Sequence, residues 1–320
     1  MNTTFNQYDL EAAKKLDAFL PSKLFDAHMH ISEFPFYGKA YFGFKEYYED
    51  MAPLLSGRKV RCNALATPTN ELKTEDGHLS TVRFFKEQLD LYPDNVGEIL
   101  VKPEESAEEI ESHLVHKNIK GLKCYHIYAK RPDTFSSDIH EYLPRAACEV
   151  ANKHKMAVTL HMVKDAALAD PENMRQIKEF ARKYPDMTLI LAHAARSFAA
   201  WTAIETVEEL KDFENVWYDF SGVCESTGMM QIIRKIGISR CMWGSDYNVS
   251  MAEGKAISLG DNFYWINSDD LKNFVSKTPM RPWHTGTENM MATRQACQLL
   301  DLSEKDIEDL FYNNAARLFS

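Results

Sequence analysis

Short runs of apolar and β-branched residues recur along the chain, separated by longer stretches in which apolar residues return every three or four positions. Runs of about five to eight such residues are typical of buried strands, and the longer periodicity is typical of amphipathic helices. The helical pattern is clearest at 105–116, 137–154, 171–183 and 225–236. Eight strands are predicted, at 23–28, 59–66, 96–101, 119–125, 156–161, 187–193, 216–220 and 240–244.

Strands that alternate with helices predict a parallel sheet, because parallel neighbours need long crossover connections. Eight units favour an α/β fold of the (β/α)8 TIM-barrel type. An open doubly wound sheet is the alternative, but the glycine-rich phosphate turn typical of many such sheets is missing. Residues 1–20 predict a leading helix. A long insertion at 247–284 follows the eighth strand, and two closing helices are expected at 286–300 and 303–318. No repeat or change of composition divides residues 1–320, so we expect one domain.

Composition narrows the function. The chain of 320 residues has 37 Lys and Arg against 47 Asp and Glu, a net charge of −10. Such a surface disfavours nucleic acid and anionic membranes as partners, although a local basic pocket can still bind a small anion. The six cysteines show no CxxC spacing, and we find neither a secretory signal nor an apolar stretch of 18 residues. We therefore expect reduced thiols, no membrane partner and a cytoplasmic protein.

Histidines and one aspartate stand at the ends of the predicted strands. His28 and His30 lie two residues apart at the end of the first strand, so their side chains share one side of it. His161 and His193 end the fifth and sixth strands, and Asp246 follows the eighth. In a barrel the carboxyl ends of all strands converge on one mouth. These groups therefore predict a divalent metal site. Imidazole and carboxylate suit Zn²⁺ best, with Mn²⁺ or Fe²⁺ as alternatives.

At these positions the sequence resembles the amidohydrolase superfamily, in particular the amidohydrolase-related group that includes aromatic-acid decarboxylases, lactonases and pyrone-dicarboxylate hydrolase. The resemblance extends over nearly the whole chain. It rests on FDAHMH at 25–30, GLK at 121–123, LH at 160–161, LAH at 191–193, GSD at 244–246 and NNAARLF at 313–319.

The resemblance implies that His28, His30, His161 and Asp246 hold one metal, with His193 beside it as an acid–base or polarising residue. A metal lowers the pKa of bound water toward ~7, Asp246 can accept the water's proton, and His193 can assist the carbonyl or the leaving group. A homodimer is expected from the resemblance alone.

Lys123 has two interpretations. Binuclear members of the superfamily carry a carboxylated lysine at the end of strand four, where it bridges two metals. The Gly-x-Lys turn resembles the mononuclear group instead. We therefore favour a Lys123 that binds substrate or pairs with a carboxylate.

Other residues near the strand ends are candidates for substrate binding. Aromatic residues form 12% of the chain but eight of the 15 residues at 34–48, which follow the first strand. This segment predicts either an aromatic wall over the mouth or packing against the barrel. Arg196 and Tyr125 lie just beyond His193 and Lys123, and Arg suits a substrate carboxylate. The substrate-binding candidates are Phe34, Tyr37, Lys123, Tyr125, Arg196 and His284.

The first functional hypothesis is a metal-dependent hydrolase of a small ester, lactone or amide. The alternative is a non-oxidative decarboxylase of an aromatic or dienoic acid, in which Asp246 protonates carbon. A sugar-acid isomerase and a barrel without catalytic activity rank lower. The expected partner is a small molecule, anionic or cyclic.

Overall fold

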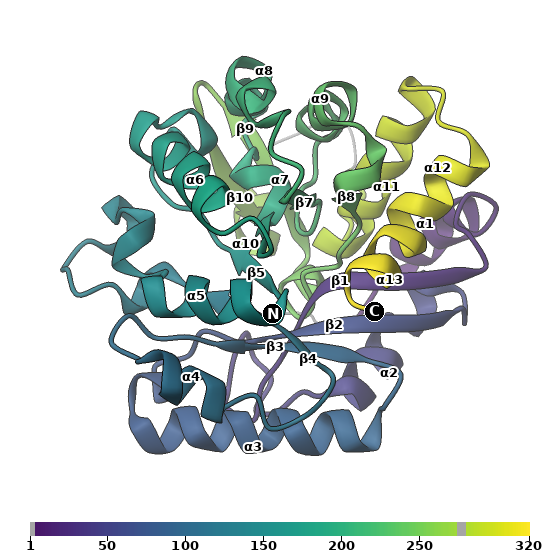
Figure 1. Ribbon diagram of the computed structural model, residues 1–320. Helices are drawn as coiled ribbons and strands as arrows, with labels where there is room; N and C mark the ends of the chain where they lie inside the picture. Colours follow the sequence, from purple (N-terminus) through teal and green to yellow (C-terminus); the bar gives the residue numbers. More distant parts are fainter. Residues whose placement is uncertain (1–3, 274–279) are drawn as a thin grey trace.

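Eight parallel strands follow one another around a barrel in the order in which they occur in the chain (Figure 1). The computed structural model describes residues 4–273 and 280–320. The TIM-barrel prediction is confirmed. The strands are β1 Lys23–Ile31, β2 Lys59–Ala66, β3 Val96–Leu100, β4 Ile119–Cys124, β5 Ala157–Leu160, β6 Thr188–Leu191, β7 Val216–Asp219 and β8 Cys241–Met242.

The barrel closes between its last and first strands through the segment that follows β8. The Ala27 amide donates to the Trp243 carbonyl at 3.1 Å, and the Asp246 amide donates to the His28 carbonyl at 2.8 Å. The His30 amide donates to the Tyr247 carbonyl at 2.6 Å. These bonds lie at the carboxyl end of β1, so the closure joins the two chain segments that carry His28, His30 and Asp246.

Helices surround the sheet on its outer side (Figure 1). Several begin as their capping residues dictate: the Asn6 and Asp170 side chains accept the first amides of α1 and α6. The helices are α1 Gln7–Asp17, α2 Phe44–Leu55, α3 Glu75–Leu91, α4 Ala107–Ser112, α5 Arg145–His154, α6 Pro171–Lys183, α7 Ala192–Arg196, α8 Trp201–Thr206, α9 Ser226–Ile236, α10 Ser268–Asn273, α11 Thr285–Leu299, α12 Glu304–Glu308 and α13 Asn314–Leu318.

The leading helix and the helix at 171–183 lie where the sequence predicts them, whereas the helix expected at 137–154 begins only at Arg145. Pro144 is the reason, since a proline lacks the amide that an interior helical position needs and takes the N-cap of α5 instead. The predicted helix at 105–116 is likewise shortened to α4, and the one at 303–318 is divided by a π-helical turn at Asp309–Asn313. Within the described residues, no helix has the length and apolarity needed to cross a membrane.

The insertion after β8 contains a β-hairpin, which the sequence analysis missed. Strands β9 Gly254–Leu259 and β10 Asn262–Asn267 pair antiparallel, with Gly260 at a positive φ of 66° in the turn. The available signal was the Gly260-Asp261 pair, a two-residue turn typical of hairpins, directly before the aromatic and β-branched run at 263–266. The part of the predicted insertion at 274–279 lies outside the described residues.

Candidate metal centre

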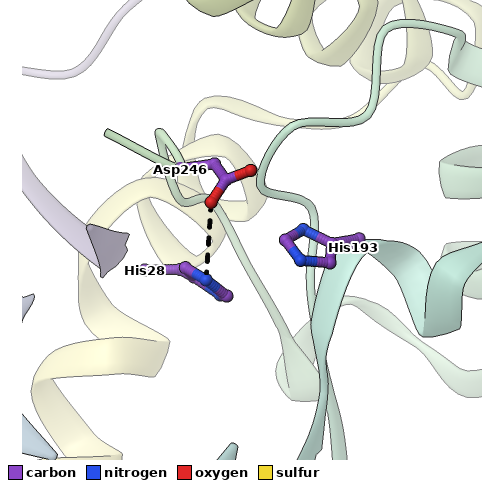
Figure 2. Close-up of side chains that lie close together, drawn as sticks. All are labelled: His28, His193 and Asp246. Atoms are coloured by element: carbon purple, nitrogen blue, oxygen red, sulfur yellow. Dashed lines mark ion pairs between the residues drawn. The ribbon is translucent and has the colours of Figure 1, made fainter. Parts of the chain in front are cut away.

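Four predicted groups meet at the carboxyl ends of the barrel strands, and Figure 2 shows three of them. Both His28 and His30 belong to β1, and their Nε2 atoms are 3.3 Å apart. Asp246 follows β8, and its Oδ1 lies 3.6 Å from Nε2 of His28 and 3.5 Å from Nε2 of His30. One ligand atom each of His28, His193 and Asp246 also lie within 4.8 Å of one another.

These separations fit a divalent cation. Zinc binds imidazole nitrogen and carboxylate oxygen at 2.0–2.2 Å, so neighbouring ligands of a tetrahedral ion are roughly 3.4 Å apart. The three distances between His28, His30 and Asp246 all lie close to that value. The donor set therefore fits a cation of zinc size held by these three residues, with room for further ligands on the cavity side.

His161 and His193 form a second pair beside this triangle. Nδ1 of His161 lies 3.1 Å from Nε2 of His193. Nδ1 of His193 lies 3.0 Å from the Ser221 carbonyl, which only accepts, so this nitrogen carries the ring proton and Nε2 presents a lone pair. The geometry places His193 between His161 and the His28–Asp246 pair.

The backbone around His193 is unusual. Strand β6 ends at Leu191, two residues earlier than predicted, and residues 193–196 all have φ between 52° and 57°. A left-handed turn costs an L-residue roughly 1–2 kcal/mol. Strain of this kind is concentrated at functional sites. Here it turns the His193 ring toward the mouth and places Arg196 one turn further on.

Asp219, at the end of β7, is a residue that the sequence analysis missed. Its Oδ2 lies 3.0 Å from Nδ1 of His28, and its Oδ1 accepts the amides of His193 and Ser221. The carboxylate holds the proton of His28 on Nδ1 and leaves Nε2 free for a metal. The signal was present, since Asp219 is a carboxylate at the end of a predicted strand.

Burial and charge set the protonation states. Burial lowers the pKa of His28, His30, His161 and His193, which favours the neutral, metal-binding form of each ring. Burial opposes ionisation of Asp246, but the nearby imidazoles outweigh it and hold the pKa of this carboxyl below its usual range. The centre is therefore a set of neutral imidazoles with an anionic carboxylate.

Lys123 is buried close enough to interact electrostatically with His28, His30 and His193, and it does not line the cavity. Its side chain is fully buried, and within the described residues Nζ has no hydrogen-bond partner. Burial lowers the pKa of Lys123, while Glu98, Asp219 and Asp246 act in the opposite direction. Its ammonium lies 5.5 Å from the centre of the Tyr125 ring.

A cavity of about 320 Å³ opens above the centre, with His30, His161, His193 and Asp246 among its lining residues. The Tyr125 ring stacks on that of His161, with 4.5 Å between ring centres. The aromatic part of the lining consists of Phe36, Tyr37, Tyr125, Phe135, Phe198, Phe263 and Trp265.

The aromatic segment at 34–48 fulfils both of its predicted roles, as one part lines the cavity and another packs against the barrel. Its first part lines the cavity through Phe36 and Tyr37, while Phe42 and Tyr47 are buried in the core. The Tyr47 hydroxyl donates to Oδ2 of Asp26 at 2.8 Å. Phe34, a predicted substrate contact, packs against the core and does not line the cavity.

His284 is also outside the cavity. It is fully buried next to α1, where its Nδ1 lies 2.6 Å from Oδ2 of Asp9. The long insertion therefore folds back onto α1 at this residue, and its hairpin, instead of His284, reaches the mouth. Phe263 and Trp265 of that hairpin line the cavity, and the sequence analysis did not select them.

Arg196 contributes a cationic side chain to the cavity wall. Its Nη1 donates to the Lys164 carbonyl at 2.9 Å, and its guanidinium lies 5.2 Å from the centre of the Phe263 ring. Within the described residues, no carboxylate forms an ion pair with it. A positive group held by stacking and a backbone carbonyl is suited to an anionic ligand.

The chain belongs to the amidohydrolase family, which matches residues 25–320. Part of it is 28% identical to an L-fucono-1,5-lactonase of Burkholderia ambifaria over 125 residues. That match spans 34% of this chain and 42% of the lactonase. Members of the family are metal-dependent enzymes, in agreement with the groups gathered at the mouth.

Solved structures share the fold. An amidohydrolase from Burkholderia multivorans with bound zinc superposes with a TM-score of 0.62 and 11% identity, over 92% of this chain and 98% of its own. The 5-carboxyvanillate decarboxylase of Sphingomonas paucimobilis gives a TM-score of 0.58 at 13% identity, over 93% and 99%. At 11–13% identity, both likenesses support the barrel fold of this chain.

Proposed function

We propose that the protein is a metal-dependent hydrolase of a small ester, lactone or amide that carries a carboxylate. The observation that carries this proposal is the triangle of His28, His30 and Asp246, which opens into an aromatic cavity with Arg196 on its wall. The local similarity to a lactonase supports the reaction class. Zn²⁺ is the metal that the donor set suits best.

His28, His30, His161 and Asp246 would hold the cation. When bound, it supplies Lewis acidity toward a carbonyl oxygen and toward water. The anionic Asp246 accepts the proton of the attacking water. Nε2 of His193 faces the same space, so it exchanges a proton with the leaving oxygen or nitrogen while Ser221 holds Nδ1. Asp219 keeps the ring of His28 in place throughout.

Arg196 and the aromatic rings define the substrate class. Arg196 pairs with a substrate carboxylate, and flat faces such as Tyr125 and Phe198 favour a planar or cyclic body. A cavity of about 320 Å³ limits the substrate to a compact molecule.

A decarboxylase of an aromatic acid is the second candidate, and the seven aromatic residues of the lining favour it. In that reaction Asp246 first takes a proton from water or from a substrate hydroxyl and passes it to the ring carbon, after which the bond to the carboxylate breaks and CO2 leaves. The same residues serve both reactions because activity depends on the site more than on the fold.

The deciding experiment incubates the zinc-loaded protein with small lactones and aryl esters in one series and hydroxybenzoates in another. Acid release without CO2 supports the hydrolase, and CO2 release supports the decarboxylase. Dialysis against a chelator should abolish turnover, and added Zn²⁺ should restore it. His30→Ala and Asp246→Asn should each abolish turnover, whereas His154→Ala, an exposed histidine, serves as control. Near-wild-type rates in either site variant would contradict the assignment.

A further inference from the structure

A second group of metal-ligating side chains lies outside the barrel mouth. His78 is in the first turns of α3, Glu105 follows β3, and His113 caps the end of α4. Both helices lie on the outside of the barrel next to β3 and β4 (Figure 1). All three side chains are buried, and the mechanism proposed above uses none of them.

The ligand atoms of this group form a compact triangle. Oε1 of Glu105 lies 3.1 Å from Nε2 of His78 and 3.4 Å from Nδ1 of His113. The two nitrogens are 3.4 Å apart. Because a tetrahedral zinc ion separates its ligands by roughly 3.4 Å, a single cation satisfies all three atoms at once.

The surroundings hold this triangle in place and leave one side open. The other oxygen of Glu105 accepts the Lys102 amide, which fixes the carboxylate. A cavity of about 340 Å³ adjoins the three residues. The lining also includes three acidic residues, Glu75, Glu104 and Glu109, together with the basic Lys102. The electrostatic potential in this cavity therefore favours a cation. Water from this cavity can supply a fourth ligand.

We propose that His78, Glu105 and His113 bind a second divalent transition metal of the zinc type, separate from the metal at the barrel mouth. Two imidazoles with one carboxylate and an open position are a common zinc ligand set. The ion ties the start of α3 to the end of α4 and to the connection after β3, and its three ligands do not line the catalytic cavity.

The site is tested by zinc stoichiometry in the full chain. Metal-free protein is dialysed against Zn²⁺ and analysed by mass spectrometry, with circular dichroism as a check on folding. We expect two zinc ions per chain in the wild type and one in Glu105→Gln, which keeps the size of the side chain and its acceptor oxygen. The double variant His30→Ala/Asp246→Asn should also retain one zinc ion. The triple variant, which combines these two substitutions with Glu105→Gln, should bind no zinc.

The control is His154→Gln, which should retain two ions, because His154 is exposed and its ring pairs with Glu111 on the surface. Glu105→Gln should keep its turnover, since the residue does not touch the catalytic cavity. Anomalous diffraction at the zinc edge on wild-type crystals gives a readout that needs no variant. A peak between His78, Glu105 and His113 supports the site. A peak only at the mouth, or unchanged stoichiometry in Glu105→Gln, would show that the two imidazoles simply donate protons to Glu105 and would overturn it.

Discussion

His28 faces the proposed metal position with Nε2 and is oriented through Nδ1. Asp219 accepts from Nδ1 at 3.0 Å, and both side chains are buried. Partners of this kind fix the tautomer of a ligating histidine and raise its basicity. We expect Asp219→Asn to weaken zinc binding by about 10–100-fold, with a parallel loss of turnover. Competition with a coloured chelator measures the affinity.

Asp186→Asn is the matched control for this change, because Asp186 is an exposed carboxylate on the loop before β6. Its zinc affinity should equal that of the wild type. An Asp219→Asn protein with full affinity would show that the tautomer of His28 does not depend on this carboxylate.

His193 combines two possible roles, ligand and proton carrier. Its Nδ1 is committed to Ser221, and its Nε2 lies 3.1 Å from His161. We expect His193→Asn to retain the mouth zinc while kcat falls by about 10²–10⁴-fold, the usual contribution of acid–base catalysis. Metal analysis and turnover on the same sample measure both. Loss of the mouth zinc would instead assign His193 as a ligand.

Glu98 makes folding stability depend on pH. Burial raises the pKa of Glu98 to about 7, although Asn63 and Thr159 donate to its Oε1. The unfolded chain ionises this group near its ordinary value of 4.5. Between pH 4.5 and 7 the folded state therefore binds more protons than the unfolded state, so this residue lowers the stability as the pH rises.

Glu98→Gln should remove that dependence, because Gln keeps the accepting oxygen and cannot ionise. Relative to the wild type, the variant should gain up to about 3 kcal/mol of unfolding free energy between pH 4.5 and 8. Urea unfolding of metal-free protein at both pH values measures the difference. Glu149→Gln, on the exposed side of α5, should follow the wild type. Parallel pH profiles for Glu98→Gln and the wild type would contradict the shifted pKa.

The hairpin of β9 and β10 covers one side of the catalytic cavity. Phe263 stacks near Phe198, with 4.6 Å between ring centres, and lies under Arg196. We expect Phe263→Ala to raise KM by up to about tenfold, since an aromatic contact contributes roughly 0.5–1.5 kcal/mol. The chemical groups are untouched, so kcat should change little. Steady-state kinetics on a substrate found in the screen proposed above separates the two constants.

Tyr264→Ala is the control for the hairpin, because alternate residues of a strand face opposite sides and Tyr264 is exposed. It should leave KM unchanged. If both variants raised KM equally, the hairpin would act through its general position and not through the Phe263 ring.

At the level of elements, the sequence predicted the centres of the strands better than the loops. The eight apolar runs are buried strands, because burial in a barrel imposes continuous apolar composition. The helix predicted at 137–154 begins only after Pro144. The rule that proline disrupts the interior of a helix was available from the sequence and would have corrected the start. The left-handed turn at 193–196 carries no glycine, so nothing in the local sequence indicated it. Its strain is offset by packing that depends on the whole fold.

At the level of the whole molecule, barrel topology explains why the proposed metal ligands could be predicted to lie together. Strand ends converge irrespective of loop sequence, so His28, His30 and Asp246 meet. Asp219 lies at the end of β7 and reaches the same place for the same reason. By contrast, the positions of His284 and Phe263 depend on how the long insertion folds back over the barrel. Sequence periodicity does not predict how the insertion folds. For this reason His284 was wrongly selected as a substrate-binding residue.

The mouth metal should also stabilise the closure of the barrel. Its ligands lie on both sides of the seam where His28 and Asp246 join through backbone hydrogen bonds. In the Glu105→Gln protein, which lacks the carboxylate of the proposed second site, free Zn²⁺ at 100 times the Kd of the mouth site should add about 2.7 kcal/mol to the unfolding free energy. Hydrogen exchange locates this effect. Zinc should slow exchange in residues 25–31 and 243–248 more than in β4, which lies away from the seam and serves as an internal control. Equal protection of all strands would show that the metal stabilises the fold without acting on its closure.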